Sequence, residues 1–81
     1  MSKFEELLKL YTDKKYPTLL TKALEIVRQE GIIITKTPVV YEVIKEEGYA
    51  HAYIIVNLYV DSWKVYLKIN DKDEVEKGVY R

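Results

Sequence analysis

The stretch HAYIIVNLYVDSWKVYLKIND, His51 to Asp71, alternates apolar and polar residues on both sides of Asp61-Ser62. Such alternation is typical of β-strands with one buried face, because successive side chains of a strand point to opposite sides. The pattern therefore predicts two antiparallel strands joined by a turn at Asp61 and Ser62. Further strands are expected over residues 32–35 and 39–44, where β-branched residues dominate.

Antiparallel pairing divides these side chains between two faces. If residues 46–49 form the first turn, Val43 lies opposite Ala52, and in the second hairpin Val60 lies opposite Trp63. One face then collects twelve uncharged positions: Val39, Tyr41, Val43, Ala52, Ile54, Val56, Leu58, Val60, Trp63, Val65, Leu67 and Ile69. We expect this face to be the core, with Trp63 buried in it.

The first thirty residues show helical periodicity instead. Ser2 and Glu5 fit a capping box, and apolar residues then recur at helical spacing, which predicts a helix over about 3–14. Pro17 suits a helix start and Gly31 a helix end, which predicts a second helix over about 18–30. The sheet is expected over about 32–70, and the charged tail 71–81 either adds an edge strand or frays.

A chain of 81 residues is expected to form a single domain, 1–81, because it cannot support two cores. The predicted fold class is α+β, with two N-terminal helices packed on one face of a three- to four-stranded antiparallel sheet. Residues 37–47 are ambiguous between strand and helix. If they and residues 50–60 were helical, the order of elements would be that of a winged helix-turn-helix. Against this alternative, the would-be recognition helix HAYIIVNLYV has no Arg or Lys.

The second face of the predicted sheet is the candidate binding or interface face. It carries Tyr53, Ile55, Asn57, Tyr59, Lys64, Tyr66 and Lys68. Tyrosines interleaved with lysines could stack bases and neutralise phosphates, or they could simply be good strand residues facing solvent. Together with Val40 and Ile44 they could also form the interface of a homodimer.

The residue types exclude several kinds of chemistry. The chain has no Cys, one His and three Gly, so we expect no metal site, no cofactor and no phosphate-binding loop. The acidic stretch 71–76 lacks the glycine that a calcium loop needs. His51 has no nearby Ser or Cys in the sequence, so a structural role is expected rather than a catalytic one. The sequence therefore predicts a protein that is not an enzyme.

Thirteen basic residues balance thirteen acidic ones, so no overall field attracts nucleic acid. No apolar run reaches the roughly 18 residues that span a bilayer, and we expect a soluble, intracellular protein, in the cytoplasm or, for a viral protein, in the host cell. Few Gln, Asn and Met stand against many Lys, Glu and Ile, a bias of heat-adapted proteins. In composition the chain is similar to small orphan proteins of hot-spring archaea and their viruses.

The expected function is that of a small non-catalytic binding or interaction protein that forms a homodimer. Nucleic acid or another protein is the alternative partner, and no membrane binding is expected. The alternative function is that of a nucleic-acid-binding regulator.

Overall fold

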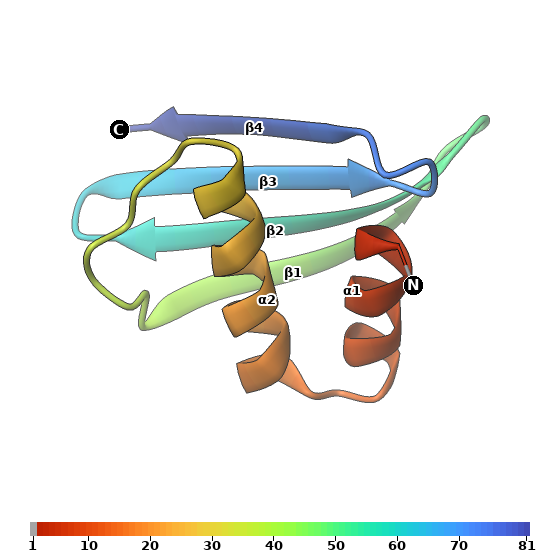
Figure 1. Ribbon diagram of the computed structural model, residues 1–81, viewed down its shortest axis with the longest axis horizontal. Coiled ribbons are helices and arrows are strands. Elements are labelled where there is room, and N and C mark those ends of the chain that lie inside the picture. The colour runs from red at the N-terminus through yellow and green to blue at the C-terminus, as the bar shows by residue number, and fades with distance from the viewer. Residues whose placement is uncertain (1) are drawn as a thin grey trace.

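A computed structural model describes residues 2–81 of the chain and confirms the α+β class. The elements are α1 (Lys3–Thr12), α2 (Tyr16–Gln29), β1 (Val40–Glu47), β2 (Ala52–Val60), β3 (Trp63–Asn70) and β4 (Val75–Tyr80). The four strands form one sheet in the order β1-β2-β3-β4, with every pair antiparallel. Both helices lie on the same face of this sheet, and α2 crosses the strands (Figure 1). Because residues 40–47 and 52–60 are strands, the winged helix-turn-helix alternative is wrong.

The ends of the two helices follow the local signals in the sequence. Ser2 Oγ accepts a hydrogen bond from the Glu5 N–H, as a serine cap does. Helix α2 begins at Tyr16 with Pro17 in its first turn, and ends in a Schellman motif. In that motif Gly31, at a φ of 91°, donates its N–H to Arg28 O, and the Ile32 N–H donates to Val27 O. Gly31 can adopt this left-handed conformation because it has no Cβ.

The register of the sheet was predicted correctly for one hairpin and wrongly for the other. In the β2–β3 hairpin, Val60 lies opposite Trp63 as expected. In the β1–β2 hairpin, Val43 lies opposite Val56 rather than Ala52, because the turn spans residues 48–51 and not 46–49. The Gly48 N–H donates to His51 O across this turn. The shift is an even number of residues, so every side chain stays on its predicted face.

The sheet begins later than expected, and its fourth strand lies in the tail, as one of the two expectations for the tail had it. Residues 32–39 form an irregular segment rather than the first strand, although Ile32 and Ile34 still pack against the core. This segment follows the cap at Gly31 and contains Pro38, whose missing N–H disfavours a place in a sheet ladder. At the other end, the charged tail contains β4, which pairs with β3 from Ile69↔Val75 to Lys64↔Tyr80.

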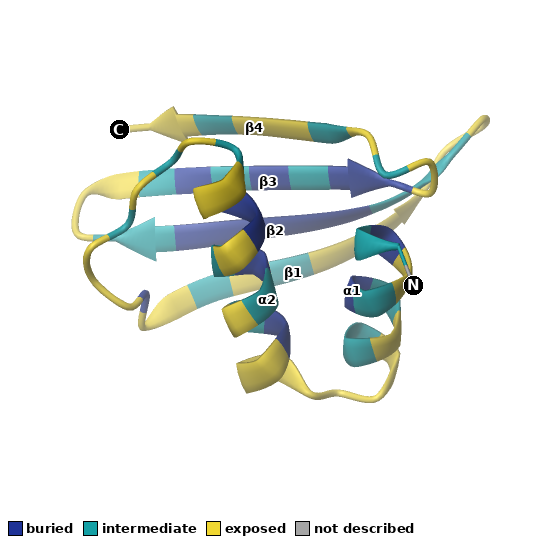
Figure 2. Cartoon of the chain, viewed as in Figure 1, coloured by how far each residue is buried: buried dark blue, intermediate teal, exposed yellow. Residues whose placement is uncertain are grey.

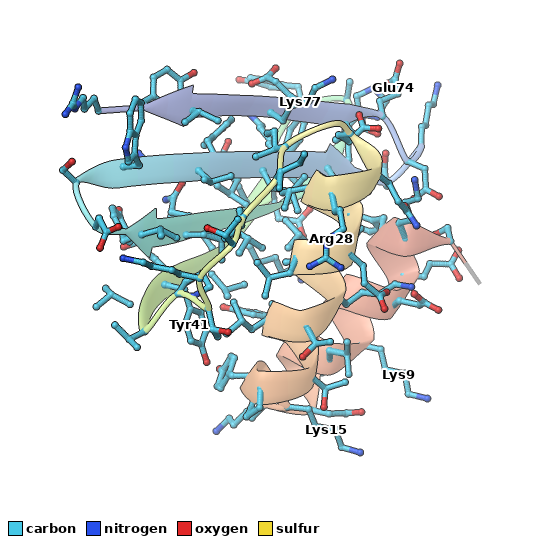
Figure 3. All side chains as sticks on the ribbon, turned by 60° about the vertical axis from the view of Figure 1, so that its left-hand side comes forward. Lys9, Lys15, Arg28, Tyr41, Glu74 and Lys77 are labelled. Atoms are coloured by element: carbon cyan, nitrogen blue, oxygen red, sulfur yellow. The ribbon has the colours of Figure 1, made fainter. Side chains whose placement is uncertain are left out.

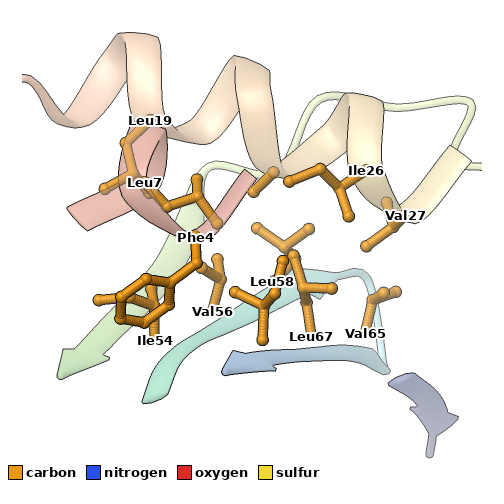
Figure 4. Close-up of a cluster of buried hydrophobic side chains, with 12 residues drawn as sticks. Phe4, Leu7, Leu19, Ile26, Val27, Ile54, Val56, Leu58, Val65 and Leu67 are labelled. Atoms are coloured by element: carbon orange, nitrogen blue, oxygen red, sulfur yellow. The ribbon is translucent and has the colours of Figure 1, made fainter. Parts of the chain in front are cut away.

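The core lies between the helices and the predicted inner face of the sheet. Its buried side chains come from α1, α2, β2 and β3 and meet between the two layers (Figure 4). They are Phe4, Leu7, Leu19, Ala23, Ile26, Val27, Ile54, Val56, Leu58, Val65, Leu67 and Ile69. The central strands β2 and β3 are therefore the most buried, and the edge strands β1 and β4 are largely exposed (Figure 2).

Trp63 lies on the inner face but is not buried as expected. It is 43% exposed, and Val39, which was expected on the same face, is 91% exposed. Trp63 is the first residue of β3 and lies at the end of the sheet crossed by the segment 32–39, beyond the two helices (Figure 1). The Arg81 guanidinium lies 5.0 Å from the centre of its ring and covers part of it.

Candidate functional site

The outer face of the sheet, which we call the open face, carries the residues singled out in the sequence. The strand register arranges them in four rows that run across the strands. The rows are Val40-Tyr59-Lys64-Tyr80, Glu42-Asn57-Tyr66-Gly78, Ile44-Ile55-Lys68-Glu76 and Glu46-Tyr53-Asn70. All seven predicted residues lie here: Tyr53, Ile55, Asn57, Tyr59, Lys64, Tyr66 and Lys68. Within residues 2–81, no helix or second sheet covers this face (Figure 1).

The middle of the open face is more buried than a solvated surface usually is. Ile55 is 8% exposed and Asn57 is 6% exposed, although nothing lies above them. The neighbours of Asn57 in its row are Glu42 and Tyr66, and its neighbours along β2 are Ile55 and Tyr59. Long side chains around these two residues therefore shield them from water.

Asn57 has only part of its hydrogen bonding satisfied. Its Nδ2 donates to Glu42 Oε1 at 2.9 Å, whereas its buried Oδ1 has no partner. A buried polar atom without a partner costs about 1–3 kcal/mol. The unpaired Asn57 Oδ1 therefore lowers the stability of the fold at this point of the open face.

Aromatic rings of the open face contact side chains on neighbouring strands, between β2 and β3 and between β3 and β4. Lys68 Nζ lies 4.3 Å from the centre of the Tyr53 ring, a cation–π contact. The rings of Tyr66 and Tyr80 meet edge to face with their centres 6.5 Å apart. Tyr80 also lies over Gly78, because a Cβ at position 78 would be only 2.8 Å from the Tyr80 hydroxyl oxygen. This close approach explains why a glycine occupies the middle of β4.

Tyr66 is the open-face residue with a shifted acidity. Burial raises the pKa of its phenol above the ordinary value, and the nearby Glu76 carboxylate raises this pKa further. The Tyr66 hydroxyl donates a hydrogen bond to Glu76 Oε2 at 3.5 Å. The phenol of Tyr66 is therefore a weaker acid than an ordinary tyrosine.

The structure adds Glu46, Glu76 and Tyr80 to the open face, and none of them was among the predicted site residues. Glu76 and Tyr80 belong to it because β4 is a strand, and Glu46 belongs to it because β1 extends to Glu47. With Glu42, the face carries three carboxylates against the two lysines Lys64 and Lys68. If residues 75–80 are taken as a strand, the alternation of its side chains places residues 76, 78 and 80 on one face. The open face is therefore not a basic surface.

His51 has a structural partner at the edge of the open face. Its Nδ1 lies 2.8 Å from Asp71 Oδ1, and Asp71 Oδ2 accepts from the Ala52 N–H at 3.3 Å. The hydrogen bond from His51, followed by that from the Ala52 backbone, lowers the pKa of the Asp71 carboxyl below its usual range. The pair ties the start of β2 to the end of β3. His51 thus has a contact within the fold, and its structural role stays a prediction.

The acidic turn 71–76 is used for contacts within the fold. Asp73 accepts from the backbone N–H groups of Lys3 and Phe4. Asn70 organises the turn, since its Oδ1 accepts from the N–H groups of Lys72 and Glu74 and its Nδ2 donates to Glu74 Oε1. Across the described part of the chain, no three His, Cys, Asp or Glu side chains are grouped so as to hold a metal ion.

Two hollows lie near the ends of the sheet. A groove of about 330 Å³ lies between the segment 32–36 and the sheet end, with Val60, Trp63, Val65 and Val79 in its wall. A second hollow of about 380 Å³ lies beside His51, Tyr53, Lys68 and Glu76 and is mostly polar. In the side-chain view, Tyr41 lies on the edge strand β1 and Lys77 lies on the opposite edge strand, β4 (Figure 3).

Neither described helix is long and apolar enough to cross a membrane. Comparison of the chain with protein family models, with curated proteins and with solved structures finds no match. The geometry of the open face is therefore the basis on which function is inferred.

Proposed function

We propose that this protein is a non-catalytic interaction protein that works as a homodimer, and that the open face is its contact surface. The observation that carries the proposal is the half-apolar centre of a sheet face that no other element covers. Ile55 is nearly buried there, Ile44 in the same row is exposed, and Val40, two rows away on β1, is exposed as well. Such an apolar patch with tyrosines around it is characteristic of an interface, because tyrosine buries a large ring while its hydroxyl finds a partner.

The proposal gives the protein no catalytic role. His51 is held by Asp71, and the two serines of the chain, Ser2 and Ser62, serve as a helix cap and as a turn residue. No nucleophile beside a general base is among these contacts, and such a pair is what covalent catalysis requires.

Binding of single-stranded nucleic acid is the second candidate function. Tyr53, Tyr59 and Tyr66 with Lys64 and Lys68 are the residue types on which such binding depends. The carboxylates Glu42, Glu46 and Glu76 on the same face weaken this candidate, because they repel phosphates. A homodimer fits the mixed charge of the face better.

The oligomeric state tests the proposed function. We expect analytical ultracentrifugation at micromolar concentrations to show a dimer for the wild type and a monomer for Ile55→Lys, since a buried lysine opposes association. Ile44→Lys, in the same row but more exposed, repeats the test with less risk to the fold. Ile33→Lys is the matched control, because Ile33 is 81% exposed and lies outside the sheet. A wild type that stays monomeric at every concentration would overturn the proposal.

Fluorescence anisotropy separates the two candidate functions. The interaction protein is expected not to bind labelled single- or double-stranded oligonucleotides at low salt. Binding of the single strand that is weakened by Tyr59→Ala, about 1–3 kcal/mol for a stacked tyrosine, would favour the nucleic-acid function instead.

A further inference from the structure

Charge on the open face is sorted by strand. The carboxylates of Glu42 and Glu46 lie on β1, and the ammonium groups of Lys64 and Lys68 lie on β3. Between them β2 carries no charge on this face, only Tyr53, Ile55, Asn57 and Tyr59. Across the first three strands, the face is therefore an acidic strip, an uncharged strip and a basic strip.

This pattern distinguishes between the ways in which two copies can pack face to face. A two-fold axis that runs across the strands places β1 on the partner's β1 and β3 on the partner's β3, so that like charges meet. A two-fold axis that runs along β2 places β2 on the partner's β2 and sets each β1 opposite the partner's β3, so that opposite charges meet. Like charges brought together across an interface are strongly unfavourable.

We infer that two copies of this chain pair through their open faces about a two-fold axis along β2, with the acidic β1 of each copy against the basic β3 of the other. The inference rests on the proposed homodimer and names its arrangement. Ile55 of one copy then lies over the partner's Ile55, at the most buried apolar point of the face. The tyrosines at the two ends of β2 lie over their own copies in the same way.

The rows of the face interlock in this arrangement. Residues in the same row face each other, so Glu42 lies diagonally between the partner's Lys64 and the partner's Lys68, one row away on either side. Rows are about 6.8 Å apart, since each contains every second residue of a strand. A lysine side chain spans that distance. Packed sheets are rotated against each other by about 30°. Because β1 and β3 lie next to β2, this rotation moves them by less than half the distance between two rows.

Strand β4 lies outside the overlap. It is two strands from the proposed axis, so it extends past the partner's β1 edge. Glu76 therefore meets no acidic residue of the partner, and the Tyr66–Glu76 and Tyr66–Tyr80 contacts within one copy are left in place. The arrangement uses the three strands whose charges match and omits the one whose charge does not.

A charge-swap experiment tests the arrangement. The first variant carries Glu42→Lys with Glu46→Lys, and the second carries Lys64→Glu with Lys68→Glu. Each variant alone has like charges on β1 and β3, so we expect the dissociation constant of its homodimer to rise by about 100-fold. An equimolar mixture is expected to form a heterodimer within about tenfold of the wild-type affinity, because every β1–β3 contact then pairs opposite charges again. Glu47→Lys is the control, since Glu47 lies on the same strand but points to the other face.

Three results would overturn the arrangement. One is that both double variants dimerise as tightly as the wild type. Another is a mixture that does not recover affinity. The third is a first variant that pairs more tightly with the wild type than the wild type pairs with itself, which is expected of an axis across the strands.

The folding of each variant and the oligomeric state of the wild type are measured in the same experiment. Circular dichroism melts establish that each variant is folded; if Lys68→Glu fails beside the cross-strand Glu76, Glu42→Lys mixed with Lys64→Glu repeats the experiment. A wild type that is monomeric contradicts the proposed function itself. A wild-type dimer that Ile55→Lys dissociates but charge swaps leave unchanged contradicts only the arrangement.

Discussion

Asp73 connects the last turn of the sheet to the start of α1, and we expect its replacement to destabilise the fold. Asp73 Oδ1 accepts from the Phe4 N–H at 2.9 Å, and Oδ2 accepts from the Lys3 N–H at 3.1 Å. These are two of the N–H groups that a helix N-terminus leaves without an intrahelical partner. Ser2 Oγ accepts a third, from Glu5. The negative charge of Asp73 also lies at the positive end of the helix dipole.

The expected cost of Asp73→Ala has two parts. Loss of a helix cap costs up to about 2 kcal/mol, and the upper value applies because two N–H groups lose a charged acceptor. Asp73 also has a φ of 61°, a left-handed conformation that costs alanine about 1 kcal/mol and that aspartate tolerates better. We therefore expect Asp73→Ala to lower the free energy of unfolding by about 3 kcal/mol. Asp73→Asn keeps an acceptor and tolerates the conformation, so about 1 kcal/mol is expected.

Asp61→Ala is the matched control for the backbone part of this cost. Asp61 has a similar φ of 55°, but its carboxylate forms an exposed ion pair with Lys36 at 3.2 Å instead of capping a helix. Its replacement should cost about 1 kcal/mol, since exposed pairs contribute little. Urea melts followed by circular dichroism, at one protein concentration because association shifts stability, give both values. Equal losses for the two variants would refute the capping role of Asp73.

Two further predictions concern the core and the response to acid. Leu67→Ala should lower the free energy of unfolding by about 3–5 kcal/mol, because Leu67 is fully buried. Trp63→Ala should cost only about 1–2 kcal/mol because the indole is half exposed, and urea melts in which Trp63→Ala costs more than Leu67→Ala would contradict its position. Asp71 has a lowered pKa in the fold, so its stabilisation is present above about pH 4 and is lost as the pH falls through the lowered pKa. Thermal melts should therefore show a stability advantage of the wild type over Asp71→Asn at pH 7 that shrinks as the pH falls below about 4; an advantage that grows on acidification would contradict this.

The sequence predicted the faces of the sheet better than its pairing. Alternation alone assigns each residue to a face, and it did so correctly for β2 and β3. The position of the β1–β2 turn depends on weaker preferences, and an exposed edge strand accepts Glu46 and Glu47 without penalty. The turn was therefore placed two residues too early. The faces were unaffected, because only an odd shift exchanges them.

The predicted burial of Trp63 was wrong for a different reason. A residue's face follows from the alternation along its own strand, but its burial depends on whether another element reaches that end of the sheet. Nothing in the local sequence shows where α2 ends above β3. The β-branched residues 32–34 predict a strand, whereas in the structure Ile32 and Ile34 belong to an irregular segment that covers part of the core. Residue preference does not distinguish a strand from an extended segment that packs without pairing.

The residues of the open face could be predicted only in part, and this affects the inferred function more than any other difference between prediction and structure. Without β4 and with a shorter β1, the predicted face carried one carboxylate, that of Glu42, beside Lys64 and Lys68, so binding to phosphates stayed open as an alternative to self-association. Pairing of the tail with β3 adds Glu76, and the longer β1 adds Glu46. A face with carboxylates on β1 and ammonium groups on β3 is matched by a second copy of itself when the two-fold axis runs along β2. The charge pattern of the open face thus depends on where the β1–β2 turn lies and on whether the tail pairs with β3, and alternation along a single strand determines neither.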